Sequence, residues 1–214
     1  MSKFETINEY RELAKRTCVD LGTIEKNMFH MNTGVITEIG EAIDPIKKHI
    51  AYNKPLDLVN IGEEIGDCAW YIANRSNFLI YDDFTKNLME EVWSERNFKE
   101  ITDDWNKTFD LEDCKAAPLE ERLMNVANLL YSISGDMPDL DERMHPSYTG
   151  ITMMALLDRA CDLLGLNFME ILNTNIEKLK KRYPEKFTEE DAINRDLDSE
   201  RATLEEGIKT KGEN

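Results

Sequence analysis

The sequence predicts an all-α fold, a helical bundle within a single domain. Apolar residues recur every three or four positions along almost the whole chain, which is the spacing of one helix face. No long stretch alternates apolar and polar residues, as a half-buried strand would. With 214 residues, of which 41% are hydrophobic, the chain is large enough to bury one core.

The N-terminal part predicts three helices. The first spans roughly Ile7 to Cys18, and the second begins near Ile24. Pro45 has no N–H to donate to the preceding turn, so we expect a kink or an early end there. A polar link at residues 52–55 then allows the third helix, starting near Leu56, to fold back antiparallel.

The rest of the chain divides by composition. Residues 76–150 contain three prolines and several acidic loops, and we interpret them as a helical insert with one amphipathic helix over 119–133. A strong helical pattern follows from Ile151 to Arg182, with a break expected near Gly165. The single domain is therefore predicted to consist of core helices at about 5–75 and 151–185, an insert at about 76–150 and a polar arm at about 186–214.

Two acidic pairs stand out in the predicted second and third helices. Glu38 with Glu41, and Glu64 with Asp67, have i, i+3 spacing, which places both carboxylates of a pair on one helix face. Both pairs lie among apolar residues, and no lysine or arginine occurs three or four positions from any of the four acids. Carboxylates that face a core need partners, so the pattern indicates a site.

The turn between these helices would bring the four carboxylates together. Like charges repel strongly in such an environment, and hard divalent cations with oxygen ligands are the natural partner. The sequence thus predicts Mg²⁺, or Mn²⁺, whereas Glu63 is expected to point to the solvated side. A di-iron centre is the alternative, but its Glu-x-x-His spacing occurs only at Glu142 and His145, in a loop-like stretch.

The net charge and the spacing of the cysteines limit the classes of partner and the cellular location that we expect. A formal net charge of −17 argues against nucleic acid, and it would also repel a nucleotide unless metal ions reverse the local field. No run of 18 apolar residues suggests a membrane span, and the first residues show no secretory pattern. The four cysteines have no CxxC spacing, so we expect a reducing, cytoplasmic location.

Several short motifs occur together in this chain. They are Tyr10–Thr17, His30–Gly34, Thr37–Glu41, Ile46–Ile50, Asn53–Pro55, Asn60–Tyr71, Asn175–Leu179, Arg182–Phe187, Asn194–Asp196 and Glu200. On these motifs, which cover about residues 5–75 and 151–205, the chain resembles the MazG-like all-α nucleoside triphosphate pyrophosphohydrolases. The resemblance implies a four-helix core, to which residues 76–150 are added.

The resemblance also implies roles for particular residues. The four acids Glu38, Glu41, Glu64 and Asp67 would bind the metal. For the reaction itself, we expect Glu41 or Glu38 to orient the attacking water. Substrate binding falls to Asn175 and Lys178, which would touch phosphate or metal-bound water, and to Arg182 and Tyr183, which would touch phosphate or ribose.

A base pocket is expected nearby. His30 and Asn32 precede Glu38 by one to two turns and are candidates to line it, although a core histidine is an equally good interpretation of His30. Trp70 is placed either to stack on a base or to pack in the core.

The expected activity is Mg²⁺-dependent hydrolysis of a nucleoside triphosphate (NTP or dNTP) to nucleoside monophosphate and pyrophosphate, in nucleotide pool control. The alternatives are a pyrimidine-specific dUTP or dCTP pyrophosphatase, and a catalytically silent nucleotide-binding or regulatory protein. Apolar residues such as Leu166, Met169 and Ile171 are expected at exposed helix edges, which predicts a homodimer or tetramer.

Overall fold

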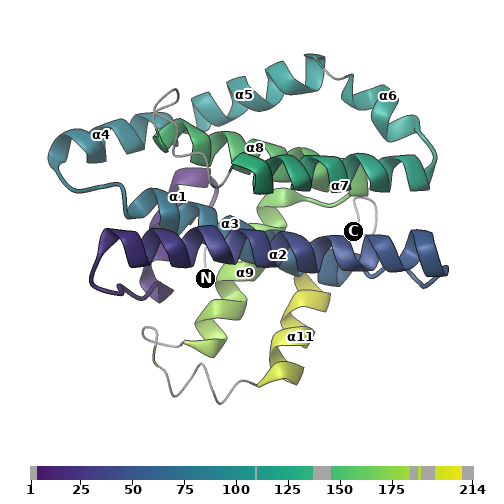
Figure 1. The fold of residues 1–214 in the computed structure, drawn as a ribbon, viewed down its shortest axis with the longest axis horizontal. Coiled ribbons are helices and arrows are strands. Elements are labelled where there is room, and N and C mark those ends of the chain that lie inside the picture. The colour runs from purple at the N-terminus through teal and green to yellow at the C-terminus, as the bar shows by residue number, and fades with distance from the viewer. Residues whose placement is uncertain (1–3, 109, 137–145, 184–187, 189–195, 209–214) are drawn as a thin grey trace.

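A computed structural model, which describes residues 4–108, 110–136, 146–183, 188 and 196–208, confirms the all-α prediction (Figure 1). The described residues form α-helices and one short 3₁₀ helix, and contain no strand. The helices are α1 (Ile7–Ala14), η1 (Lys15–Thr17), α2 (Ile24–Tyr52), α3 (Leu58–Asn77), α4 (Asp83–Val92), α5 (Glu95–Thr108), α6 (Leu111–Ala116), α7 (Leu119–Asp136), α8 (Pro146–Leu164), α9 (Phe168–Arg182) and α11 (Leu197–Gly207).

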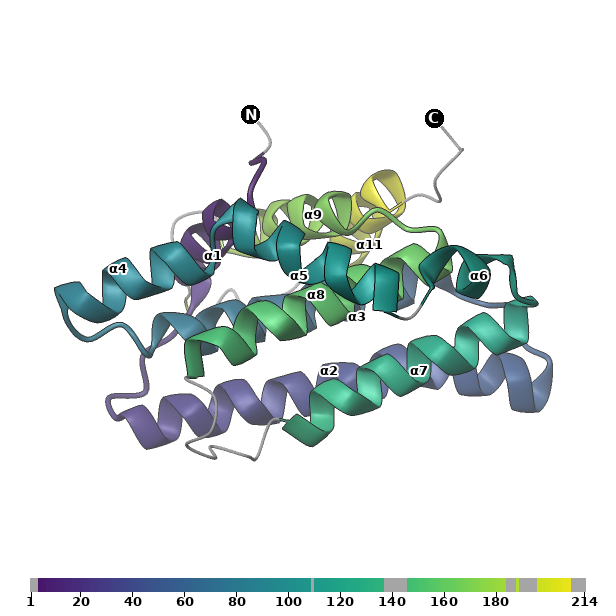
Figure 2. The ribbon, with the colours of Figure 1, turned by 90° about the horizontal axis from the view of Figure 1, so that it is seen from above.

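The helices are stacked in layers. Helices α2 and α7 form one outer layer, α3 and α8 lie behind them, and α1, α5, α9 and α11 lie on the far side (Figure 2). The contacts α2–α3, α3–α8, α8–α7 and α7–α2 close a four-helix bundle. Helix α7 belongs to the segment expected as an insert, yet it contributes four fully buried side chains to this bundle: Leu123, Val126, Leu130 and Ile133.

Helix α2 passes through Pro45 without ending, so the expectation of an early end is wrong. Ala42 and Ile46, on either side of the proline, are 1% and 2% exposed, and this burial offsets the backbone hydrogen bond lost at Pro45. The helix ends instead at Asn53, whose left-handed backbone (φ 52°) and N–H bond to the His49 carbonyl cap it. Because α2 continues this far, it runs beside α3 along the whole of the acidic segment.

The predicted break between α8 and α9 is confirmed. Gly165 has a φ of +73°, which glycine adopts at little cost, and the Asn167 side chain accepts a hydrogen bond from the Glu170 N–H at the start of α9. Helix α9 then packs across α3, where a Cβ on Gly66 would lie only 3.2 Å from that of Asn175. This close approach brings α9 side chains to the acidic residues of α3.

Other predictions about packing have mixed outcomes. Leu166 and Ile171 are 1% and 2% exposed and Met169 packs against the core, so the expectation that they form exposed edges is wrong. Several residues of the predicted motifs and of the Glu-x-x-His spacing lie outside the described residues: Glu142, His145, Asn194 and residues 184–187.

The cysteine and membrane predictions can also be compared with the fold. All four cysteines lie among the described residues and none of them forms a disulfide; Cys68 and Cys161 are buried, as small apolar side chains usually are. Among the described residues, no helix is both long enough and apolar enough to span a membrane.

Candidate functional site

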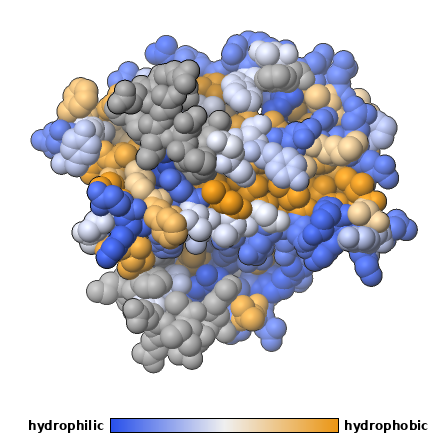
Figure 3. All heavy atoms as spheres, viewed as in Figure 1, coloured by the Kyte–Doolittle hydropathy of each residue, from blue (hydrophilic) through white to orange (hydrophobic). Residues whose placement is uncertain are grey.

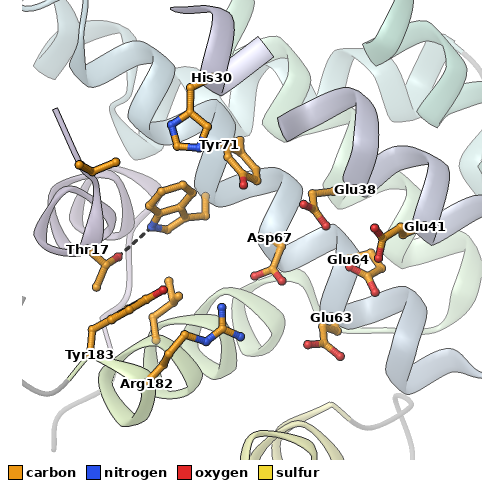
Figure 4. Close-up of a pocket in the computed structure, with 13 residues that line it drawn as sticks. Thr17, His30, Glu38, Glu41, Glu63, Glu64, Asp67, Tyr71, Arg182 and Tyr183 are labelled. Carbon is orange, nitrogen blue, oxygen red and sulfur yellow. Dashed lines mark hydrogen bonds between the residues drawn. The ribbon is translucent and has the colours of Figure 1, made fainter. Parts of the chain in front are cut away.

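Most of the predicted site residues line one cavity between α2, α3 and α9, with a volume of about 430 Å³ (Figure 4). Asn175 and Lys178 are not among the lining residues and lie behind Asp67. Carboxylates gather at one end and aromatic rings at the other, and Arg182 and Asp67 lie between them. The lining residues are Thr17, Val19, His30, Glu38, Glu41, Glu63, Glu64, Asp67, Trp70, Tyr71, Leu179, Arg182 and Tyr183.

Three of the four predicted metal ligands form a tight cluster. Glu38 and Glu41 from α2 and Glu64 from α3 each offer a carboxylate oxygen within 4.8 Å of the other two. Glu64 is buried, Glu38 is half-buried and Glu41 is exposed to solvent. The i, i+3 spacing and the helical turn-back therefore bring these acids together, as the sequence predicts.

The electrostatics of the cluster favour a bound cation or proton. Burial raises the pKa of Glu38 to about 7, and the Asp67 and Glu41 charges add to this effect. Burial also raises the pKa of Glu64 to about 9, with further contributions from Asp67, Glu63 and a hydrogen bond to Glu38. The raised pKa values of both groups mean that the cluster favours a proton, or a cation in its place, over three unpaired negative charges.

Asp67 is held differently from the three glutamates. Its Oδ1 accepts hydrogen bonds from Asn175 Nδ2 (2.6 Å) and Lys178 Nζ (2.7 Å), and its Oδ2 accepts from Lys178 Nζ (2.5 Å). The Tyr10 hydroxyl lies 3.1 Å from Asn175 Oδ1 and so orients the amide. Asn175 and Lys178 do reach the site, as predicted, but their direct partner is this carboxylate.

Lys178 is a buried cation within the acidic site. Its side chain is 0% exposed, and its Nζ also lies 3.2 Å from Glu63 Oε1. Burial disfavours the charged amine, but the attraction of Asp67 and Glu63 outweighs this effect and raises the pKa of Lys178. The expectation that Glu63 is a solvated acid on the other side of α3 is wrong, because α9 covers that side.

Arg182 and Tyr183 line the cavity at the end of α9. The Arg182 guanidinium is held by two hydrogen bonds to the buried Glu200 carboxylate of α11, with an Nε–Oε1 distance of 2.9 Å. Arg16 donates a hydrogen bond to the Tyr183 carbonyl, which fixes the backbone beneath the ring. Figure 4 shows Arg182 extending toward the carboxylates.

The aromatic end of the cavity is built around Trp70 and Tyr71. The Trp70 indole N–H lies 3.0 Å from Thr17 Oγ1, and its ring packs edge-on against Tyr71. A Cβ on Gly34 would lie 2.3 Å from the Tyr71 ring, so only glycine lets this ring lie against α2. His30 packs edge-on against Tyr71, and within the described residues its buried Nδ1 has no hydrogen-bond partner.

One of the two predicted base-pocket residues does not line this cavity. Asn32 accepts a hydrogen bond from Arg75 Nε (3.0 Å), and is therefore engaged between α2 and α3. Sequence reasoning also missed Thr17, Val19 and Leu179. Thr17 and Leu179 are the last residues of two motifs that carry the resemblance, and Val19 follows the first of these motifs by two positions, but no role was assigned to any of the three.

A second cavity of about 580 Å³ adjoins the first and shares Glu41 and Glu64 with it. Lys48 and Lys54 are its basic lining residues, and the Asn60 amide also lines it. Lys48 is paired with Asp44. The glutamate cluster therefore separates an aromatic cavity from a cavity that contains two lysines.

The glutamate cluster fits a hard divalent cation. Its donors are all carboxylate oxygens, it already needs a proton to relieve repulsion, and it opens to solvent through Glu41. In contrast, Asp67 already has three hydrogen bonds from Asn175 and Lys178.

Comparisons with known proteins give no further information on the family or the activity. No family model matches the chain, and neither the curated proteins nor the solved structures contain a match. The MazG-like resemblance therefore stays a prediction.

Proposed function

We propose that this protein is a nucleoside triphosphate pyrophosphohydrolase of the MazG-like type, dependent on Mg²⁺ or Mn²⁺. One observation carries the proposal. Glu38, Glu41 and Glu64, from two helices, present carboxylate oxygens within 4.8 Å of one another at one end of a cavity whose other end is aromatic. That arrangement suits a ligand with a polyphosphate at one end and a flat ring at the other.

The three glutamates would hold the metal. When bound, Mg²⁺ would polarise a phosphoryl oxygen and lower the pKa of a bound water. Among the chain's own groups, Glu41 is the better candidate to orient the attacking water and accept its proton, because Glu38 is hydrogen-bonded to Glu64. The water oxygen bonds to the α-phosphorus as the bridging α–β P–O bond breaks, so the products are a monophosphate and pyrophosphate.

Cations around the cluster would receive the phosphates. Arg182 is pre-oriented by Glu200, so its guanidinium can contact phosphate oxygens with little loss of side-chain entropy. Lys178 reduces the repulsion that the acidic site exerts on an anion, although its ammonium is already paired with Asp67. Lys48 and Lys54 line the adjoining cavity, where the leaving pyrophosphate could be accommodated.

The aromatic end would bind the nucleoside. The Trp70, Tyr71 and Tyr183 rings offer stacking surface for a base, and the His30 ring lines the same cavity. These features suit a base of either size, so the pyrimidine-specific alternative is a question for the substrate panel. Such an activity would act in nucleotide pool control.

The experiment is a panel of NTPs and dNTPs with Mg²⁺, in which pyrophosphate and phosphate release are measured separately. We expect pyrophosphate with at least one nucleotide, and Glu41→Gln should lower kcat by about 100-fold or more, as expected for loss of a metal-binding and proton-accepting carboxylate. Glu25→Gln, at an exposed position of the same helix, is the matched control and should retain activity. Release of single phosphate would overturn the proposed reaction, and binding without turnover would indicate the silent regulatory alternative.

A further inference from the structure

Arg182 is the one lysine or arginine among the described residues that line the aromatic cavity. Five acids line the same cavity: Glu38, Glu41, Glu63, Glu64 and Asp67. An anion that enters this cavity is repelled by the acids and attracted by the guanidinium of Arg182. The orientation of that guanidinium therefore decides where a phosphate group can bind.

The Arg182 guanidinium is held along one edge only. Glu200 of α11 accepts hydrogen bonds from Arg182 Nε, at 2.9 Å, and from Nη2. A guanidinium has five N–H groups, so this side-on pair leaves both N–H groups of Nη1 and one of Nη2. In the part of the chain that the structure describes, these three groups donate no hydrogen bond. Because Figure 4 shows Arg182 extending toward the carboxylates, its free end is a two-pronged donor inside the cavity.

Glu200 also keeps Arg182 away from a competing carboxylate. Burial lowers the pKa of Arg182, but the hydrogen bonds and charge of Glu200, together with the charge of Asp67, outweigh burial and raise it. Asp67 lines the same cavity as Arg182. Without Glu200, the long arginine side chain would be drawn toward Asp67, where it would occupy the space of a phosphate.

Glu200 is an unusual residue to bury in α11. Figure 3 shows mainly hydrophilic residues where Figure 1 places this helix. Its two buried residues are Glu200 and Leu204, which are 4% and 2% exposed. A buried ion pair contributes no more to stability than well-packed apolar side chains of the same size. Stability alone therefore does not account for an acid at this position, whereas orientation of Arg182 does.

Close packing at the other end of α11 fixes the position of Glu200. A Cβ on Gly207 would lie 2.1 Å from Thr174 Oγ1, so only glycine lets α11 lie this close to α9. The next residue, Ile208, packs on Gly62 of α3, where an added Cβ would lie 2.8 Å from Ile208 Cγ2. Gly207 is about two helical turns from Glu200. The contacts of α11 with α3 and α9 therefore determine where the Glu200 carboxylate lies.

We propose that Glu200 is a positioning residue for substrate binding, which makes α11 part of the substrate site although Glu200 does not line the cavity. Glu200 directs the free end of Arg182 to the phosphates of the ligand and touches neither ligand nor metal. The inference rests on the proposed function for the class of ligand, a polyphosphate. Loss of Glu200 should weaken polyphosphate binding and leave the metal site intact.

The first test uses inorganic tripolyphosphate, which has no base and requires no turnover. Its affinity is measured by isothermal titration calorimetry in the presence of Mg²⁺. Glu200→Gln should raise Kd by about tenfold or more, as expected when a phosphate loses a charge-assisted contact. Glu205→Gln, at an exposed position of α11 paired with Arg201, is the matched control and should bind like the wild type. A wild type that does not bind, or unchanged affinity in Glu200→Gln, would overturn the inference.

A double-mutant cycle tests whether Glu200 acts through Arg182. The variant Arg182→Met/Glu200→Gln should bind tripolyphosphate no more weakly than Arg182→Met, because the second change then has nothing left to misplace. Additive losses would overturn the inference. The affinity for Mn²⁺ without phosphate should be unchanged in Glu200→Gln, and a weaker ion would instead assign the effect to the metal site.

Gly207→Val tests the role of α11 with both charged residues in place. The added side chain would displace α11 from Thr174, so tripolyphosphate should bind more weakly, as in Glu200→Gln. It should cause no further loss in a Glu200→Gln background. Wild-type affinity in Gly207→Val would contradict the claim that the position of α11 sets the site.

Kinetics separate this inference from the proposed function. With a nucleotide that the wild type hydrolyses, Glu200→Gln should raise KM by about tenfold with little change in kcat, as loss of uniform binding does. An unchanged KM would overturn the inference and leave the proposed function standing. Tripolyphosphate binding that depends on Glu200, in a protein that releases pyrophosphate from no nucleotide, would overturn the proposed function and support the inference.

Discussion

Replacing Lys178 with methionine removes the one described cation that contacts both Asp67 and Glu63. Breaking a buried ion pair by deleting one partner costs about 3–5 kcal/mol when the remaining charge stays buried. The Asp67 and Glu63 side chains retain 24% and 18% exposure, so water can partly solvate them. We therefore expect a loss of roughly 2–3 kcal/mol in unfolding free energy, or about 4–12 °C in Tm for a chain of this length.

Urea and thermal unfolding of the metal-free protein measure this loss. Lys180→Met is the matched control, because Lys180 lies on the same helix and pairs at 2.7 Å with Glu177, which is half exposed. An exposed pair of that kind contributes only about 0–1 kcal/mol. The double variant Lys178→Met/Asp67→Asn should recover about 1–2 kcal/mol, since the uncompensated charge is then gone. If Lys178→Met were as stable as Lys180→Met, the assignment of Lys178 as the counter-ion of the site would be refuted.

Two further perturbations probe the site through stability. Glu38 and Glu64 hold protons in the folded state above the ordinary carboxyl value of 4.5, so metal-free stability should fall as pH rises from about 5 to about 8. Glu64→Gln should make the metal-free stability depend less on pH. The stabilisation by Mg²⁺ should grow as pH rises, because the ion then replaces fewer protons. A metal-free Tm that rises from pH 5 to pH 8 would contradict the raised pKa values of Glu38 and Glu64. Gly34→Ala would place a Cβ against the Tyr71 ring and should cost about 1–3 kcal/mol, whereas Gly135→Ala in α7, where an added Cβ meets nothing within 4 Å, should stabilise by about 0.4–1 kcal/mol. Thermal melts of the two glycine variants check this contrast, which equal effects would disprove.

The glutamate cluster could be predicted because its determinants are local. The i, i+3 spacing, the apolar neighbours and the absence of nearby lysines are all visible within residues 34–73. The ion pair between Asp67 and Lys178 is harder to predict from the sequence. Lys178 lies 111 positions from Asp67 and reaches the site only through the packing of α9 on α3. From the sequence alone, the lysine-rich end of α9 is typical of a solvent-exposed helix C-terminus, where cations interact favourably with the helix dipole.

Long-range packing also explains the predictions that were wrong. The position of Glu63 around the axis of α3 predicts a solvent-exposed side chain. In the folded chain, Lys178 of α9 packs against that side of α3 and contacts Glu63. Pro45 locally favours a kink or an early end of α2, but the helix continues past it, with Ala42 and Ile46 buried on either side. In each case, the local preference was identified correctly and a contact with a distant helix decided the outcome.

The hydrogen bonds of Asp67 lead to a prediction about metal stoichiometry. With Asp67 bound by Lys178 and Asn175, only Glu38, Glu41 and Glu64 remain as ligands, and their three charges suffice to hold one divalent ion. We expect Mn²⁺ titration of the nucleotide-free protein, followed by electron paramagnetic resonance, to give one tight ion per chain. Any further ion should bind together with a nucleotide, whose phosphates add the missing oxygen ligands. Glu41→Gln should weaken the first ion by about tenfold or more, and Asp67→Asn should weaken it less. Two equivalent tight ions without nucleotide would mean that Asp67 leaves Lys178 to bind metal.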